Sequence, residues 1–252
     1  MPGTSSSALG PLPVRSEVAT AAPLPRSMDR HFYLVMAIAS TLLIFVAFSR
    51  TFYLRSYFTA GPLDAIVVIH GIVFSLWMLL FVTQTALIDT NRPQVHGKLG
   101  FAMGALAIVM VVLGTMVAFR AERLGRGLPF PDTIFLFSLA DIVTFTIFVL
   151  AGFWYRHQPE FHQRLMLLSV TAGLLVAAPP RLPFVAGKPP LMALVGFSFL
   201  FAGPLYDLIM RRRLHRAYIW GCIFALVTGP PVRFAISLTP GWHLIARRLV
   251  GH

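Results

Sequence analysis

Residues 64–88 read DAIVVIHGIVFSLWMLLFVTQTALI, a stretch in which His70 is the only ionisable side chain after Asp64. Six further apolar stretches occupy residues 32–49, 99–119, 133–155, 164–182, 190–210 and 217–237. A helix needs about 20 mostly apolar residues to cross the hydrocarbon core of a bilayer. The stretches therefore predict an all-α fold, a seven-transmembrane helical bundle.

Composition agrees with a membrane protein, because 57% of the 252 residues are hydrophobic and only 12% are charged. A soluble domain needs a larger polar surface, whereas lipid solvates an apolar exterior. The net charge of +12 would suit nucleic acid, but the basic residues lie mostly between the apolar stretches. There they orient the chain and contact lipid headgroups. We expect the lipid bilayer as partner and no nucleic acid; the oligomeric state stays open.

Residues 1–28 are rich in Pro, Ser and Ala and lack the apolar core of a signal peptide. They predict a disordered cytoplasmic tail, followed by one transmembrane domain at residues 29–252. The single cysteine, Cys222, excludes a disulfide framework or a thiolate metal cluster within one chain.

Positive charge gives the orientation of the bundle. Eleven basic residues lie in the tail and the even-numbered connections, against nine on the opposite face. The short connection with Arg211, Arg212, Arg213 and Arg216 adds weight, because short loops dominate topology. We therefore predict a cytoplasmic N-terminus and an external C-terminus.

A histidine precedes each odd-numbered apolar stretch: His31, His96, His162 and His215. Odd helices enter the bilayer from the same face, so these side chains should lie at one membrane surface. Three of the stretches begin with similar histidine motifs, which predicts a repeated helical hairpin.

This row of histidines has three interpretations. The imidazoles could anchor the helix ends at the interface, or the helix N-termini could form an anion site with Lys98, Arg164 and Arg216. Alternatively, two or more imidazoles could ligate haem iron or a metal ion. The sequence contains no HExxH motif and no cysteine ligand pair, so the spacing leaves all three open.

Four ionisable side chains fall within the predicted outer half of the bilayer: His70, Asp141, Arg181 and Arg233. Charged groups in spans are costly unless paired or hydrated, so they indicate function by default. At about 1.5 Å of rise per residue, Asp141 lies at a depth where it could pair with His70 or with Arg233. Such a pair would either hold the helices in one packing arrangement or form part of a binding site. We take Asp141, Arg181 and Arg233 as candidates for a substrate pocket.

Two double prolines, Pro179-Pro180 and Pro230-Pro231, close the fifth stretch and interrupt the seventh. They either end helices near the interface or shape a partly wet cavity, because proline removes a backbone donor. Asp207, also a pocket candidate, precedes Arg211 by four residues, a spacing typical of an ion pair on one helix face. Asp207 could instead orient a surface histidine.

Several motifs resemble those of a family of polytopic bacterial inner-membrane proteins to which no activity is assigned. The motifs are HGx5W…Q from His70 to Gln84, HxKLG from His96, HxRLMLL from His162, and Tyr206-Asp207 followed by His215. The resemblance covers roughly residues 50–235 and implies a bacterial inner-membrane location. More loosely, histidine-bearing hairpins are similar to those of b-type cytochromes and haem-handling proteins of oxidase assembly. Those proteins pair axial histidines at one depth, whereas His70 stands alone in its half.

The leading hypothesis is a membrane protein that binds haem b or a transition metal in a redox or cofactor-assembly role, with a respiratory or assembly partner. Its candidate ligands are His70, His96, His162 and His215. The alternative is a small-molecule permease or lipid-interacting protein with a polar pocket in the outer half. The sequence lacks a phosphate-binding GxxxxGK[ST] loop, a dinucleotide GxGxxG motif and a nucleophile elbow. Whether the protein is an enzyme stays open.

Overall fold

The computed structural model describes residues 26–58, 61–125 and 131–251, and all regular secondary structure in these ranges is helical. Seven helical spans are long and apolar enough to cross a membrane. They are Met28–Tyr53, Ala65–Asp89, Pro93–Leu124, Asp132–Trp154, Pro159–Arg181, Pro189–Arg211 and Arg216–Ser237. The all-α, multi-pass prediction is therefore confirmed.

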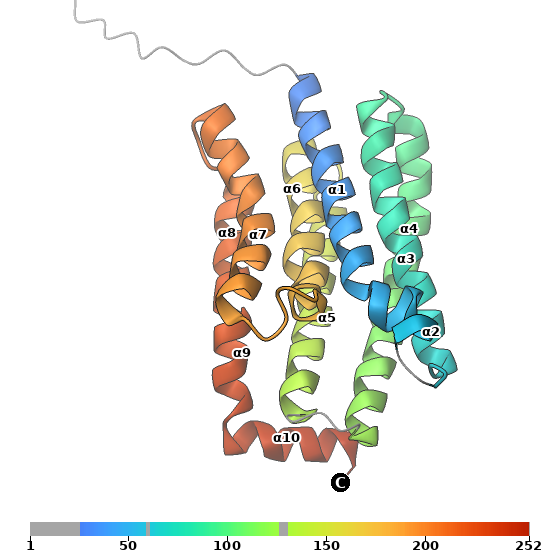
Figure 1. Cartoon of the computed structure of the whole chain (residues 1–252). Helices are drawn as coiled ribbons and strands as arrows, with labels where there is room; N and C mark the ends of the chain where they lie inside the picture. Colours follow the sequence, from blue (N-terminus) through green and yellow to red (C-terminus); the bar gives the residue numbers. More distant parts are fainter. Residues whose placement is uncertain (1–25, 59–60, 126–130, 252) are drawn as a thin grey trace, which may run out of the picture.

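The helices follow one another as a bundle with one helix across its end (Figure 1). The first four spans are formed by α1 (Arg26–Phe48) with the π turn η1 (Ser49–Tyr53), α3 (Ala65–Asp89), α4 (Pro93–Leu124) and α5 (Pro131–Trp154); α2 (Arg55–Phe58) links the first two. The fifth span comprises α6 (Pro159–Leu168), the π turn η2 (Ser169–Leu174), and the 3-10 turns η3 (Leu175–Ala177) and η4 (Pro179–Arg181). Then follow α7 (Pro189–Arg211), α8 (Arg216–Val227), α9 (Pro230–Ser237) and α10 (Pro240–Val250).

Proline begins six of the ten α-helices in the described residues, at Pro93, Pro131, Pro159, Pro189, Pro230 and Pro240. Proline is favoured at the first helical position because the amide it lacks would have no partner there. The prolines thus fix the residue at which each of these helices begins.

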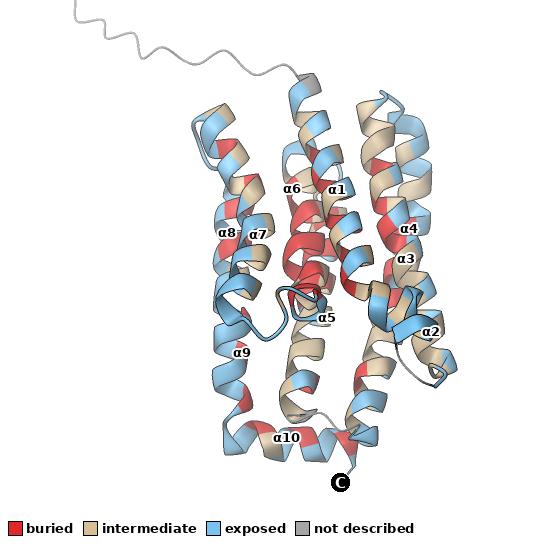
Figure 2. Ribbon diagram, viewed as in Figure 1, coloured by how far each residue is buried: buried red, intermediate tan, exposed pale blue. Residues whose placement is uncertain are grey.

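The fifth span is the central one. In its most apolar window 61% of residues are buried, against at most 39% in any other span. Figure 2 shows this burial along α6. The span contacts α1, α5, α7 and α8. A helix so enclosed needs no lipid-facing surface and can carry polar side chains, as Ser169 and Thr171 illustrate.

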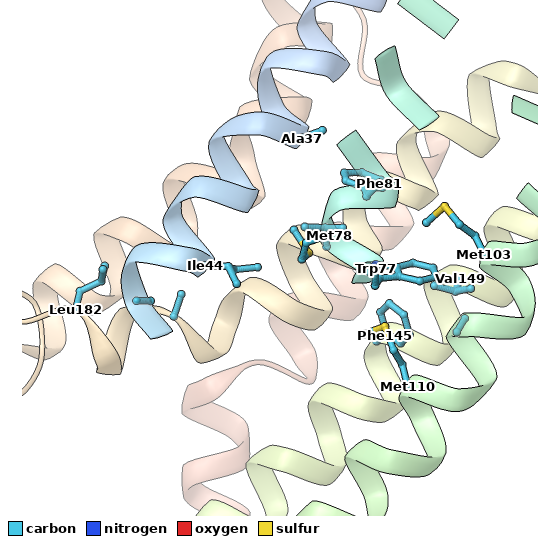
Figure 3. Close-up of a cluster of buried hydrophobic side chains, with 14 residues drawn as sticks. Ala37, Ile44, Trp77, Met78, Phe81, Met103, Met110, Phe145, Val149 and Leu182 are labelled. Carbon is cyan, nitrogen blue, oxygen red and sulfur yellow. The ribbon is translucent and has the colours of Figure 1, made fainter. Parts of the chain in front are cut away.

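The largest apolar core lies between α1, α3, α4, α5 and the π turn η2. Trp77 lies edge-on against Phe145 with ring centroids 5.1 Å apart, and Met78 and Ile44 extend the cluster (Figure 3). A second cluster joins α5, α6 and α8 around Phe148, Leu168 and Tyr218.

The helix α10 lies across the end of the bundle opposite the start of α1 (Figure 1). Thr239 caps its N-terminus, and the indole of Trp242 donates to the backbone oxygen of Asp132 at 2.8 Å. Trp242 and Ala246 of α10 pack with Phe135 of α5 in a small apolar cluster. These contacts fix the C-terminal segment against the bundle.

Three boundaries can be compared with the sequence prediction, and the end of the fifth span agrees with it. Of the predicted tail, residues 1–25 lie outside the described residues, whereas 26–28 already belong to α1. The double proline at 179–180 ends the fifth span in a 3-10 turn. The seventh span breaks at Thr228-Gly229, and Pro230-Pro231 then opens α9, because prolines fit the first helical turn.

Gly173 gives a test of the central packing. A Cβ at this position would lie 2.8 Å from Cα and 2.9 Å from the backbone nitrogen of Phe145. We predict that Gly173→Ala costs about 1–3 kcal/mol, because backbone cannot move aside as a side chain can. Thermal melting of the protein in detergent should show a fall of several degrees.

Gly196→Ala is the matched control, because no atom lies within 4 Å of its Cβ position on α7. Its melting temperature should be unchanged or slightly higher, since alanine favours helix. Equal melting temperatures for the two variants would contradict the close packing of η2 against α5.

Candidate functional site

The histidine row lies at one end of the bundle, as the sequence predicts, because α1, α4, α6 and α8 all begin there (Figure 1). The four side chains nevertheless have different surroundings. His31 is exposed and pairs with Asp89 at the end of α3. His96 and His162 lie together, and His215 turns toward its own helix.

The rings of His96 and His162 lie edge to face, with centroids 6.0 Å apart and an interplanar angle of 88°. Nδ1 of His96 is 3.3 Å from the backbone oxygen of Gln84, and Nδ1 of His162 is 2.8 Å from that of Gly152. A carbonyl oxygen only accepts, so each Nδ1 carries the proton. In the neutral ring Nε2 is then a free lone-pair donor.

The same contact occurs in two successive hairpins. In α3–α4 and in α5–α6, the histidine near the start of the second helix donates to a carbonyl in the last two turns of the first. This repeated contact agrees with the hairpin repeat expected from the sequence.

The third hairpin departs from this pattern. Nδ1 of His215 accepts from the backbone N–H of Ala217 at 3.2 Å, and the ring packs on Phe161. Partial burial, together with the nearby charge of Arg164, lowers the pKa of His215 and favours the neutral ring that this cap requires. His215 therefore serves as a helix cap and does not join the pair.

Two side chains, Gln84 and Met166, lie near the backbone groups that orient this pair. Gln84, only 6% exposed, has a buried Oε1 without a hydrogen-bond partner, and its Nε2 lies 3.6 Å from where a Cβ on Gly100 would be. The sulfur of Met166 lies 2.7 Å from the corresponding position on Gly152. An amide and a thioether are therefore close to the residues that orient the two imidazoles.

A buried ion network lies beside this pair. Arg164 binds Asp207 through two hydrogen bonds, Nε to Oδ2 at 2.9 Å and Nη2 to Oδ1 at 2.7 Å, and both side chains are 0% exposed. Glu160 accepts from Arg164 and from Arg211, each at 2.6 Å. Arg211 also pairs with Asp29 of α1, so the network joins α1, α6 and α7.

Asp207 lies near Arg211, as its spacing predicts, but it contacts His215 through the backbone and not through the imidazole. Its Oδ1 is 3.7 Å from Nε of Arg211, and its Oδ2 accepts from the backbone N–H of His215 at 3.4 Å. Its main partner is Arg164, 43 residues earlier in the chain. Arg164 therefore holds this ion network together. The anion-site interpretation had instead placed Arg164 among the groups that bind the anion.

In the half of the bundle opposite the histidine row, Arg233 pairs with Asp141, one of the two pairings that the sequence allowed. Arg233 also donates from Nε to the backbone oxygen of Thr228 and from Nη2 to the hydroxyl of Thr144. Within the described residues His70 does not bond to Asp141, and its buried Nδ1 has no hydrogen-bond partner there.

Arg181 is exposed. It donates from Nη1 to the backbone oxygen of Ala177 at 2.6 Å and lies over the ring of Phe48. Arg181 lies close enough to Asp141 for their charges to interact.

His70, Asp141, Arg181 and Arg233 are not among the residues that line the hollow in this half of the described structure. The hollow beside the break in the seventh span is a shallow apolar groove on α9, lined by Pro231, Val232, Ala235, Ile236 and Thr239. Among the side chains that the structure describes, no group of three or more His, Cys, Asp or Glu is arranged to hold a metal. Of the four predicted cofactor ligands, the structure brings together only His96 and His162.

No family model, no curated protein and no solved structure matches the chain. The resemblance to a family of bacterial inner-membrane proteins, and the looser one to haem-handling proteins, therefore stay predictions from motifs.

The Arg164–Asp207 pair can be tested by comparing single and double substitutions. Asp207→Leu should destabilise the protein by about 3–5 kcal/mol, because it leaves a buried guanidinium without its carboxylate. The double variant Arg164→Leu/Asp207→Leu should lose less, since it buries no uncompensated charge. Denaturant titration in mixed detergent micelles measures both.

Arg120→Gln is the control, because Arg120 pairs with Asp64 through a partly exposed contact at 3.0 Å. It should change stability by at most about 1 kcal/mol. A double variant as unstable as Asp207→Leu alone would show that the pair itself, and not charge compensation, carries the stability.

Proposed function

We propose that this protein binds a transition metal ion, or haem iron, through His96 and His162, and acts in redox chemistry or cofactor assembly. The observation that carries the proposal is the pair itself: two imidazoles held by backbone carbonyls, with rings 6.0 Å apart. Metal-binding histidines commonly donate their second ring N–H to such an acceptor, which fixes the tautomer and the ring orientation.

The separation of the rings is compatible with one shared ion. With metal–nitrogen bonds of about 2.0–2.1 Å, two imidazoles on one ion have centroids about 5 Å apart at a tetrahedral angle and about 6.3 Å apart when linear. The observed 6.0 Å lies within this range. This separation is therefore compatible with both Nε2 atoms reaching one ion.

The surroundings favour a single ion over haem. Bis-histidine haem ligation requires room for the macrocycle on every side of the axis between the rings. Here Phe161 of α6 stacks on Tyr155, and Met166 of α6 packs closely against Gly152 of α5. A single ion requires only the space between two ring nitrogens.

The location of the pair also supports a role in handling metal. It lies at the end of the bundle where α1 begins, which the charge distribution assigns to the cytoplasmic face of a bacterial inner membrane. A metal ion bound there would be accessible to a cytoplasmic or membrane partner, such as a respiratory or assembly protein.

The proposal is tested by metal analysis and by absorption spectra of the detergent-purified protein, oxidised and dithionite-reduced. We expect one metal per chain in the native protein, and loss of it in His96→Ala and in His162→Ala, because each removes one of two ligands. A Soret band with reduced α and β bands would identify the metal as haem iron.

His157→Ala is the matched control, since His157 is an exposed histidine in the connection between α5 and α6. It should keep the metal. Full metal content in both His96→Ala and His162→Ala would refute the site.

A second candidate function, binding or transport of an anionic small molecule or lipid, is favoured by Arg181. This exposed guanidinium is held between a backbone carbonyl and an aromatic ring, and Arg233 already neutralises the nearby Asp141. The outer half therefore carries an excess positive charge, which attracts anions in a medium of low dielectric constant.

For this second function we predict that glycerol 3-phosphate raises the melting temperature of the native protein and that Arg181→Gln removes this shift. The neutral amide keeps hydrogen-bonding capacity but cannot attract an anion. Arg120→Gln, at a partly exposed arginine in the last turns of α4, should keep the shift. An equal shift in both variants would exclude Arg181 from the site.

A further inference from the structure

We infer that the ion held by His96 and His162 is monovalent copper, Cu(I), and that the thioether sulfur of Met166 is its third ligand. This inference rests on the proposed function and adds the identity of the metal. It depends on where Met166 lies, on the chemical nature of the donors, and on the charge around them.

Met166 follows His162 by four residues on α6, and residues at this spacing lie on the same helix face. Its sulfur lies 2.7 Å from where a Cβ on Gly152 would be. Gly152 is also the residue whose carbonyl orients the ring of His162. The glycine therefore leaves room for the sulfur next to the residue that orients the imidazole, and any larger residue there would displace the sulfur.

The donors at this place are two imidazole nitrogens and a thioether, all neutral and including one soft atom. Soft thioether ligands select Cu(I), and imidazole is a good ligand for copper. Magnesium, calcium and manganese prefer oxygen donors, usually carboxylates.

The acidic side chains at this end of the bundle are committed to other partners. Asp89 pairs with His31, Glu160 with two arginines, and Asp207 with Arg164. Cys222, on α8, packs with Phe148 and Leu168 in the second apolar cluster. In the part of the chain that the structure describes, the pair therefore has no carboxylate or thiolate within its own cluster.

Charge adds an independent argument. With neutral ligands the net charge of the site equals that of the ion. The cost of burying a charge grows with its square, so a monovalent ion costs about a quarter of what a divalent ion of similar size costs. The site therefore favours Cu(I) over Zn²⁺ or Fe²⁺.

The buried Oε1 of Gln84 gives a further indication of a polar ligand. The backbone oxygen of Gln84 orients His96, while its side-chain oxygen has no partner. A buried oxygen that accepts no hydrogen bond destabilises the protein. A water molecule on the ion would provide the donor that it lacks.

The test uses the full-length protein in detergent, without oxygen, with Ag(I) as a redox-inert probe and Cu(I) measured by competition with a chelator. We expect one Cu(I) or Ag(I) per chain and preference for Cu(I) over Zn²⁺. Met166→Leu keeps the volume of the side chain and removes the sulfur, and should weaken Cu(I) binding at least about tenfold, as loss of a supporting group at metal sites does. X-ray absorption of the native copper form should show one sulfur neighbour.

Met116→Leu, at an exposed methionine on α4, is the control and should bind Cu(I) as the native protein does. Native affinity in Met166→Leu, a copper spectrum without sulfur, or preference for Zn²⁺ would each overturn the inference. In these cases metal loss in His96→Ala and His162→Ala would leave the proposed function intact. Copper retained by both histidine variants would instead refute the proposed function, and the inference with it.

Discussion

Arg164 and Asp207 are two opposite charges with no exposed surface, and the arrangement of the bundle follows from the need to keep them together. Both side chains lie in spans, where an unpaired charge is costly. Their pairing requires α6 to be enclosed and α7 to lie against it. Glu160, Arg211 and Asp29 extend the same network to α1. Replacing such a pair by apolar side chains often costs little, so its main effect here is to fix which helices are neighbours.

At the other end, each double proline is followed by an arginine that donates to a backbone carbonyl just before the prolines. Arg181 donates to Ala177, and Arg233 donates to Thr228. Proline interrupts helical hydrogen bonding, and carbonyls within a bilayer need a donor. These two arginines therefore stabilise the breaks in the fifth and seventh spans. Arg233 also neutralises Asp141, whereas Arg181 lies over the ring of Phe48.

The sequence predicted the features that follow from the order of residues along single helices. These are the seven spans, the histidines at one end, and the matching depths that allow Asp141 and Arg233 to pair. The sequence could not predict contacts that depend on how helices are rotated about their axes. Arg164 and Asp207 are 43 residues apart, and no local spacing indicates that they meet. The meeting of His96 with His162, and the exclusion of His70 and His215, depend on the same rotations. Met166 was missed because an isolated methionine in an apolar helix ordinarily indicates packing.

The candidate metal site and the buried ion network are structurally linked, because His162 and Arg164 are two residues apart on α6. Each histidine is oriented by the hairpin to which it belongs, through Gln84 in one and Gly152 in the other. The distance between the two rings therefore depends on how the hairpins α3–α4 and α5–α6 sit against each other. The network anchors α6 to α1 and α7, and the Trp77 core joins α3 to α5. A substitution that loosens either contact would change the separation of the imidazoles without touching them, so the folding of the central span and the geometry of the pair cannot vary independently.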